Sequence, residues 1–197
     1  LARIRRDLGQ EMDLQTLFET ATVAGMAARL QTAEAADVAL VAPIEVADRS
    51  EGAPLSWSQQ RLWFLEQFED LGAAYHIEGA LRLEGDLDEV ALQRTLDRIV
   101  ERHEALRTVF GRAEDGEPVQ RVELGEEFAL ERHDLSKLAE PEQRQAVRQM
   151  LQEASARRFD LERGPLIRGL LVKLGERQHL LFVSMHHIVS DGWSIGV

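Results

Sequence analysis

The stretch LLFVSMHHIVSDGWSIGV, residues 180–197, decides how the rest of the chain is interpreted. It opens with an apolar run at residues 180–183, which is rich in branched and aromatic side chains and follows the polar segment 175–178. A short run of this kind, bounded by polar residues, predicts a buried β-strand. Two histidines come next, and then the turn signal Asp191-Gly192. The sequence therefore predicts a strand that carries an imidazole to its own end.

His186 and His187 are adjacent, and adjacent side chains on a strand point to opposite faces. They are therefore poorly placed to bind one metal ion together, and we expect one to face the core and the other a cleft. Histidine exchanges protons near neutral pH, with an unperturbed pKa of about 6.5, so the outward ring is a candidate general acid or base. Asp191 could orient that imidazole, or it could pair with a cation and lock the turn. The pair alone is equally consistent with two core histidines followed by a turn-forming aspartate.

The composition narrows the class of protein. Of 197 residues, 44% are hydrophobic and 29% charged, as in ordinary globular domains. The net charge of -12 disfavours a nucleic-acid partner, because an acidic chain repels phosphate backbones. The absence of cysteine excludes disulfides, thiolate metal sites and a cysteine nucleophile. No apolar run approaches the ~20 residues of a membrane span, no signal peptide opens the sequence, and it begins at Leu1 rather than Met. We expect a piece of a longer cytoplasmic protein that has no membrane partner.

The N-terminal quarter of the chain predicts helices and then a linker. Leu1, Ile4 and Leu8 share one helical face, and Thr22 stands as an N-cap before a third helical pattern. So short a segment cannot bury a core of its own. Residues 32–53 mix alanines with acidic residues and keep neither a helical nor a strand period, which predicts a linker and a domain boundary.

A segment of different character begins at Pro54 with PLSWSQQRLWFLEQFE. Ser56 is followed three residues later by Gln59, the pattern of a helix-capping box. Apolar side chains then recur at helical spacing, so we expect an amphipathic helix packed on the core. Arg61 lies among these apolar residues and would need an anionic partner if it were buried.

Strands and helices follow one another through the rest of the chain. Apolar and polar residues alternate over residues 75–84, which predicts a half-buried strand, and Asp88 caps a predicted helix that runs to His103. Further strands are expected at residues 106–110, 119–124, 128–133 and 166–174, and a helix from Pro141. A tight turn at residues 175–178 would join the last of these strands to the histidine-bearing strand as an antiparallel hairpin. The mixture predicts an α+β fold.

The pattern HHIVSDG resembles the HHxxxDG signature of the condensation domains of nonribosomal peptide synthetases, which belong to the chloramphenicol acetyltransferase-like acyltransferases. The matching positions are His186, His187, Asp191 and Gly192. Other segments resemble further motifs of these domains in the family's order: SWSQQRLWFL from Ser56, RHEALRTVF from Arg102 and FDLERGPLIR from Phe159. The N-terminal sequence RIRRDLG…DLQTLFETATVAGMAARL resembles the last part of a peptidyl carrier domain.

This resemblance implies a domain organisation. Residues 1–31 would be the C-terminal remnant of a carrier four-helix bundle, residues 32–53 the linker, and residues 54–197 the N-terminal lobe of a condensation domain, an α/β sandwich. The serine that bears phosphopantetheine would lie upstream of Leu1. Condensation domains place their substrate tunnel between two lobes, and the chain stops after the signature. We therefore expect that this fragment alone cannot condense substrates.

The resemblance also implies a chemistry, which is amide bond formation between a donor thioester and an acceptor amine. Phosphopantetheine on upstream and downstream carrier domains would hold both substrates, the adenylation domain of the module would be a further partner, and no metal is implied. His187 would lie at the reacting amine, as a base or as a positioning group, and the Gly192 backbone amide would stabilise the oxyanion. Arg61 would form a salt bridge with Asp191 and hold the loop, with His186 as structural support.

Two alternatives stay open. An epimerisation domain shares HHxxxDG but inverts an α-carbon, and a non-catalytic module would use the same fold only to dock carrier domains. The motif that begins at Ser56 and the DGWS ending at Ser194 favour condensation over epimerisation.

Overall fold

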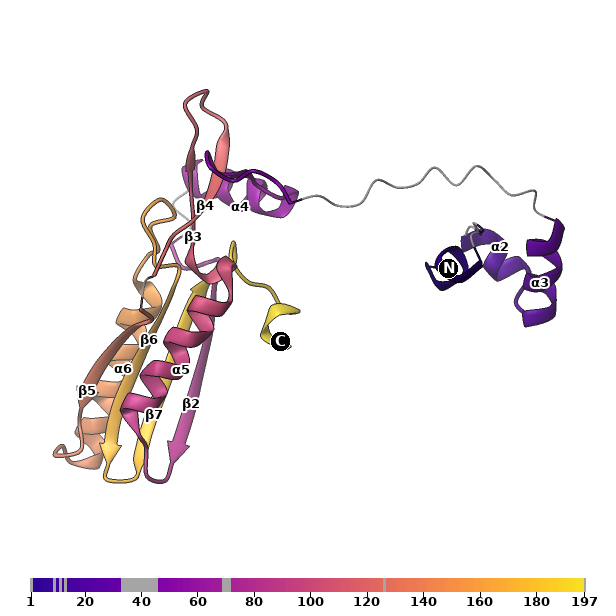
Figure 1. Cartoon of the computed structure of the whole chain (residues 1–197). Helices are drawn as coiled ribbons and strands as arrows, with labels where there is room; N and C mark the ends of the chain where they lie inside the picture. Colours follow the sequence, from indigo (N-terminus) through magenta and orange to yellow (C-terminus); the bar gives the residue numbers. More distant parts are fainter. Residues whose placement is uncertain are drawn as a thin grey trace. The chain divides into compact units, whose positions relative to one another are not determined.

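The computed structural model of the chain describes residues 2–8, 10, 12, 14–32, 46–68, 72–125 and 127–196. The chain divides into two compact units, Leu1–Ala47 and Asp48–Val197, which are treated separately below (Figure 1). The central part of the predicted linker, residues 33–45, lies outside the described residues.

The smaller unit contains three short helices, α1 (Ala2–Leu8), α2 (Leu14–Glu19) and α3 (Val23–Thr32). The predicted cap of the third is confirmed, because the Thr22 hydroxyl oxygen accepts a hydrogen bond from the Gly25 N–H at 3.1 Å. Large apolar side chains on these helices are exposed, among them Phe18 at 75% and Val23 at 83%. None of the described residues of this unit is buried, as expected for a segment too short to enclose a core.

The larger unit is built on a four-stranded sheet with the order β2-β7-β6-β5 (Figure 1). The strands are β2 (His76–Glu84), β5 (Ala129–Asp134), β6 (Ile167–Gly175) and β7 (Gln178–His186). β7 pairs antiparallel with β2 and β6, whereas β5 and β6 are parallel. The predicted hairpin is confirmed, since β6 and β7 pair from Ile167 with Met185 to Gly175 with Gln178. β7 is therefore an inner strand, and the two histidines lie at its C-terminal end.

Two helices cover opposite faces of this sheet (Figure 1). α6 (Glu140–Ala156) packs over Leu170, Val172 and Phe182. α5 (Glu89–Arg102) packs through Val100 against Ile167 and Phe128 on the other face. Because both faces of β6 and β7 are covered, these strands read as continuous apolar runs in the sequence. β2 pairs only with β7 among the described strands, and this edge position leaves Leu81 61% exposed, although its apolar-polar alternation predicts a half-buried strand.

A second, three-stranded sheet has the order β1-β4-β3. Its strands are β1 (Ala53–Pro54), β3 (Thr108–Arg112) and β4 (Pro118–Val122). The strand predicted at residues 106–110 begins later than expected, because Leu106 and Arg107 belong to the 3-10 turn η1 (Glu104–Arg107). The Thr108 hydroxyl donates to the Glu104 carbonyl at 2.8 Å and closes this turn.

The end of the predicted linker belongs structurally to the larger unit. Arg49 forms an ion pair with Glu104 at 2.7 Å, and Ala53 pairs with Gln120 in β1 and β4. The compact unit therefore includes residues before Pro54, where the composition changes. The backbone pairing of β1 explains the difference, because a two-residue strand leaves no periodic signal in the sequence.

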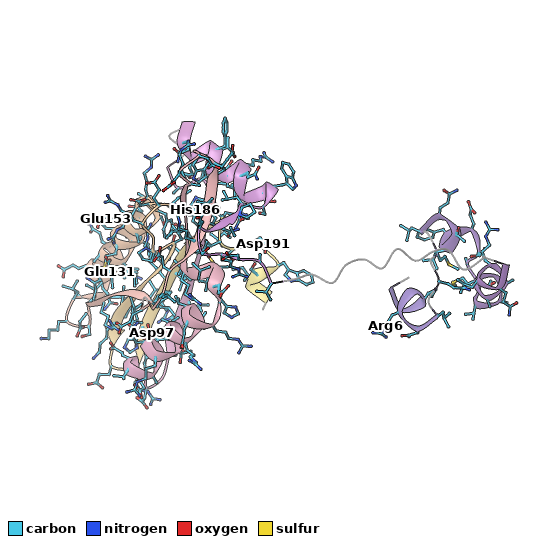
Figure 2. All side chains as sticks on the ribbon, turned by 45° about the horizontal axis from the view of Figure 1, so that its top comes forward. Arg6, Asp97, Glu131, Glu153, His186 and Asp191 are labelled. Atoms are coloured by element: carbon cyan, nitrogen blue, oxygen red, sulfur yellow. The ribbon has the colours of Figure 1, made fainter. Side chains whose placement is uncertain are left out.

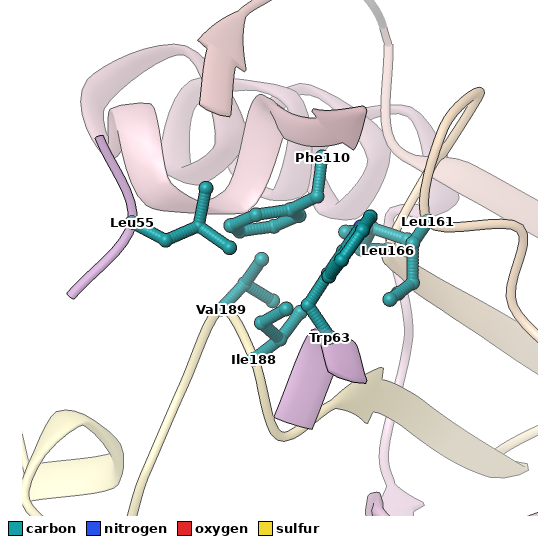
Figure 3. Packing of buried hydrophobic residues seen from close by; sticks show 7 residues of the cluster. All are labelled: Leu55, Trp63, Phe110, Leu161, Leu166, Ile188 and Val189. Atoms are coloured by element: carbon teal, nitrogen blue, oxygen red, sulfur yellow. The ribbon is translucent and has the colours of Figure 1, made fainter. Parts of the chain in front are cut away.

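The helix predicted after Pro54 is α4 (Trp57–Phe68), and its capping box is formed. The Gln59 side chain accepts from the Ser56 N–H at 2.9 Å, and the Ser56 hydroxyl oxygen accepts from the Gln59 N–H at 3.3 Å. Beyond the sheets, α4 contributes to a buried cluster that we call the signature core (Figure 3). The signature core consists of Leu55, Trp63, Phe110, Leu161, Leu166, Ile188 and Val189. Ile188 and Val189 directly follow the two histidines, so this cluster anchors the segment on which the candidate site is built.

Candidate active site

The two histidines at the end of β7 point in different directions, as predicted. His186 is 1% exposed and therefore buried, whereas the next residue, His187, is exposed. Backbone hydrogen bonds hold this end of the strand on both sides. The His186 N–H donates to the Leu166 carbonyl at 2.9 Å, and the His187 N–H donates to the Tyr75 carbonyl at 2.8 Å. The chain then turns, because the Val189 N–H donates back to the His186 carbonyl at 3.1 Å.

The buried ring of His186 has a partner at each nitrogen. Its Nδ1 accepts a hydrogen bond from the Ile188 backbone N–H at 3.0 Å, and its Nε2 lies 3.3 Å from Oε1 of Glu66 on α4. Since Nδ1 is an acceptor, the ring proton belongs on Nε2, where it is donated to the carboxylate. Burial lowers the pKa of His186 from its ordinary value, and the hydrogen bond to Glu66 opposes this effect. Its two partners and its lowered pKa favour the neutral ring, and the supporting role expected for His186 stays a prediction.

The exposed ring of His187 lies in the wall of a pocket of about 630 Å³. The pocket lies between the start of α4 and the segment that follows β7. Its lining residues are Ser56, Ser58, Gln59, Arg61, Leu62, Tyr75, His187, Ile188, Val189, Ser190, Asp191 and Ser194. Histidine is the side chain that proteins most often use as a general acid or base, and the pocket leaves room for a substrate beside His187. The predicted cleft for one of the two histidines is thus present.

Asp191 lies at the surface near the C-terminal turn, in contrast to His186 in the interior (Figure 2). Its carboxylate accepts hydrogen bonds from the Ser194 N–H at 2.9 Å and from the Ser194 hydroxyl at 2.7 Å. The carboxylate therefore caps the 3-10 turn η2 (Ser194–Gly196). These hydrogen bonds, that of the Ser194 side chain first, lower the pKa of Asp191.

The expected salt bridge between Arg61 and Asp191 is not formed in this structure. No ion pair within the described residues joins the two side chains, although both line the pocket. The physical reason lies in their surroundings. Both side chains are exposed, so burial does not force them to pair, and Oδ1 of Asp191 already accepts hydrogen bonds from Ser194 in its own loop. The two roles expected for Asp191, orienting the imidazole or pairing with a cation, both differ from these hydrogen bonds, which come from Ser194 in its own loop.

Gly192 is exposed and does not line the pocket. A side-chain carbon added to it would meet nothing within 4 Å, so the space next to its backbone is open. Its assignment as an oxyanion donor stays a prediction.

Two contributors to the site were missed by the sequence reasoning. Gln59 lies within 3.5 Å of the Ile188 carbonyl, and Glu66 contacts His186. Gln59, Trp63 and Glu66 are spaced i, i+4 and i+7, which places them on one face of α4. That face contacts the residues at and after the end of β7. The helical spacing was a usable signal, but nothing in the sequence identifies what the face meets.

No three His, Asp or Glu side chains gather as metal ligands in the part of the chain that the structure describes. Within the same residues, no helix combines the length and the apolar character that crossing a bilayer requires.

Comparison with known proteins identifies the family. The model of the condensation-domain family matches residues 49–197, and the chain belongs to this family. The match confirms the family expected from the motifs, and the solved structures below confirm the mixed α+β fold. Condensation domains of nonribosomal peptide synthetases are enzymatic domains of the acyltransferase type.

The chain is similar to parts of much longer proteins. It is 39% identical to a linear gramicidin synthase polypeptide of Brevibacillus parabrevis over 198 aligned residues, which cover 100% of this chain and 4% of that protein. It is 42% identical to the chondramide synthase of Chondromyces crocatus over 156 residues, 79% of this chain and 4% of that protein. The chain therefore spans only a few per cent of the length of these curated relatives.

Solved structures agree with the fold. The first condensation domain of the calcium-dependent antibiotic synthetase, in complex with a substrate analogue, is 29% identical with a TM-score of 0.63, over 73% of this chain and 34% of that chain. The starter condensation domain of rhizomide synthetase has a TM-score of 0.65 at 24% identity, again over 73% of this chain and 34% of that one, and shows likeness of fold alone.

Proposed function

We propose that this chain supplies the His187-bearing part of a site that forms amide bonds in nonribosomal peptide synthesis. The donor is an aminoacyl or peptidyl thioester on an upstream carrier domain, and the acceptor is the amine of an aminoacyl group on a downstream carrier. One observation carries the proposal. In a chain of the condensation-domain family, the second histidine of the HHxxxDG pattern is exposed in the wall of a pocket of about 630 Å³.

The reaction joins two tethered substrates. The acceptor amine attacks the thioester carbonyl carbon, the new C–N bond forms, the C–S bond breaks, and the pantetheine thiol leaves with a proton in place of the acyl group. The nitrogen must lose one proton along this path. His187 takes that proton or holds the amine while the proton leaves. Placing two tethered reactants together supplies much of the rate enhancement, because it removes the entropy cost of a bimolecular encounter.

The remaining site residues support this step. The backbone N–H of Gly192 stabilises the negative charge that develops on the carbonyl oxygen. Asp191 shapes the loop that carries Gly192, Arg61 supplies a positive charge at the same pocket, and His186 holds the strand end from inside. A direct Arg61–Asp191 contact plays no part in this proposal, since the two side chains do not pair.

Phosphopantetheine enters this scheme as the arm that presents each substrate, and its attachment serine belongs to the carrier domains. Hydroxyl and amide side chains in the pocket, from Ser56, Ser58, Gln59 and Ser190, suit an arm that contains amide groups. The partners that follow are the two loaded carriers and the adenylation domain of the same module. A cytoplasmic location remains a prediction from the sequence.

We also infer that residues 1–31 are the end of a carrier domain and that residues 32–53 link it to a condensation lobe at residues 54–197. The support is that the gramicidin synthase relative matches 100% of this chain, whereas the condensation-domain match starts at residue 49. Labelling the intact protein with a phosphopantetheinyl transferase and mapping the modified peptide tests this inference. A modified serine N-terminal to Leu1 is expected, and modification only at a distant position would contradict it.

Product analysis tests the proposed reaction. The intact synthetase is supplied with both carriers loaded, and the carrier-bound products are released and identified by mass spectrometry and chiral chromatography. Formation of the amide is the expected result. An acceptor left uncoupled with an inverted donor α-carbon would favour epimerisation, and unchanged substrates on competent carriers would favour a docking module.

A further inference from the structure

The ring of His186 is buried and has a hydrogen-bond partner at each of its two nitrogens. It is 1% exposed, and its edge contacts are with other rings, His76 and Phe159, each with a centroid 6.2 Å away. Its two nitrogens have the partners described above, the Ile188 N–H at Nδ1 and the Glu66 carboxylate at Nε2. Glu66 lies 120 residues away in the sequence and reaches the ring from α4.

These two contacts require the same tautomer. A carboxylate at Nε2 can only accept, so it stabilises the ring with its proton on Nε2. That tautomer leaves Nδ1 free to accept the Ile188 N–H. In the opposite tautomer an N–H at Nδ1 would face the N–H of Ile188, and Nε2 would face the carboxylate without a proton, so both contacts would become repulsive.

The hydrogen bond from the Ile188 N–H to Nδ1 of His186 joins the two neighbours of His187, the candidate catalytic residue. His187 lies between His186 and Ile188, so a hydrogen bond that joins these neighbours fixes the backbone on both sides of His187. Ile188 is 4% exposed in the signature core, and the His187 N–H is held by the Tyr75 carbonyl at 2.8 Å. With its two neighbours directed inward and its own backbone bonded, the His187 side chain is left to project into the pocket.

We propose that Glu66 is a positioning residue for His187. Glu66 holds His186 in the tautomer with its proton on Nε2, and this tautomer accepts the Ile188 N–H at Nδ1. The orientation of the His187 side chain between these two residues therefore depends on Glu66. This inference rests on the proposed function insofar as it concerns catalysis, but the orientation of His187 can be measured without catalysis. Glu66 does not contact the pocket and is not a catalytic residue.

Three variants of the intact synthetase separate positioning from a general loss of structure. Glu66→Ala removes the acceptor, Glu66→Gln keeps a carbonyl oxygen that can accept from Nε2–H, and Gln67→Ala alters the neighbouring exposed residue on α4 as a matched control. The first readout is the rate at which diethyl pyrocarbonate modifies His187, followed by peptide mass spectrometry. The second is the single-turnover rate of condensation with loaded carriers.

Glu66→Ala is expected to change the His187 modification rate by at least about twofold and to lower the condensation rate by roughly ten- to a hundredfold, as small displacements of a catalytic group do. Glu66→Gln and Gln67→Ala should remain close to the parent protein in both readouts. A His187 modification rate that is unchanged in Glu66→Ala, or changed equally by Glu66→Gln, would overturn the proposal. Altered His187 reactivity with unaltered condensation would uphold the positioning role and count against the proposed function instead.

A double variant tests whether Glu66 acts on His187 through His186. His186→Asn can keep an acceptor for the Ile188 N–H but has no Nε2 to contact Glu66. If Glu66 acts through His186, adding Glu66→Ala to His186→Asn changes the His187 modification rate no further. Additive effects of the two substitutions would contradict the proposed route.

Discussion

The backbone N–H of His187 donates to the Tyr75 carbonyl at 2.8 Å, so the residue just before β2 holds the candidate catalytic residue at the end of β7. β2 and β7 then pair along their whole length, starting with His76 opposite His186. The reactive end of β7 is therefore part of a continuous backbone ladder, which fixes its position better than a free loop would.

The signature core, which anchors the segment after the two histidines, predicts a large loss of stability when it is disrupted. Phe110 is 0% exposed and packs in the cluster that holds Ile188 and Val189. Phe110→Ala should lower the free energy of unfolding by about 3–5 kcal/mol, because it removes a buried ring and leaves a cavity. Urea denaturation of the chain measures this loss. Leu124→Ala, at a side chain 90% exposed, is the matched control and should stay within about 0.5 kcal/mol of the parent; equal losses in both variants would contradict this account of the core.

Gly169 in β6 predicts an effect of close packing. A methyl group at this position would lie 2.7 Å from Cε1 of Phe128 and 3.0 Å from Cδ1 of Leu130. Gly169→Ala should therefore destabilise the chain by about 1–3 kcal/mol, as overpacking does. In the edge strand β2, a methyl group on Gly79 would meet nothing within 4 Å, so Gly79→Ala should leave stability unchanged or raise it by up to about 1 kcal/mol. Comparing the two denaturation midpoints checks the prediction, which fails if Gly79→Ala is the more harmful change.

The buried His186 and the partly buried His76 predict how stability depends on pH. Burial is the main cause that lowers the pKa of His186 and of His76, so both bind protons less readily in the folded chain than in the unfolded chain, where the pKa is about 6.5. Their contribution to stability is therefore fully present above about pH 6.5 and is lost as the pH falls below that value. Urea midpoints measured between pH 7.5 and 5.5 should decrease toward acid. A midpoint that rises over this interval would contradict a lowered pKa for the two rings in the folded chain.

The cap formed by Asp191 predicts the behaviour of the C-terminal turn. Ser194→Ala removes a hydroxyl that donates to the carboxylate at 2.7 Å, so the turn should open more readily. Hydrogen–deuterium exchange of residues 191–196 should become faster. Ser136→Ala breaks the analogous contact with Asp134 and should leave exchange at residues 191–196 unaltered. If Ser194→Ala also leaves it unaltered, the hydroxyl contact between Ser194 and Asp191 does not order this turn.

Hydrophobic periodicity was sufficient to predict the elements that carry the site. β6 and β7 are covered on both faces, so their apolar runs and the polar turn between them predicted the hairpin and its direction. The strict alternation of neighbours along a strand predicted that His186 and His187 would face different environments, and this is observed. Local rules of this kind depend only on residues that are close in the sequence.

Contacts between distant segments could not be predicted in the same way. The partner of His186 lies on α4, and no sequence period connects the two. The expected Arg61–Asp191 pair came from resemblance, which does not show that Oδ1 of Asp191 accepts two hydrogen bonds from Ser194, only three residues away. The Asp-x-x-Ser spacing is a capping pattern and was a readable signal. Competition between a local hydrogen bond and a distant ion pair is decided by geometry, which the sequence alone does not contain.

The central claim is that the exposed imidazole of His187 takes part in amide bond formation. Its most direct test is the single-turnover rate of the intact synthetase with both carriers loaded, compared between His187→Ala and His133→Ala, the latter at an exposed histidine on β5 outside the pocket. We expect His187→Ala to lower the rate by roughly 10²- to 10⁴-fold, while His133→Ala remains near the parent value. An amide-forming rate in His187→Ala equal to that of the parent protein would contradict the claim.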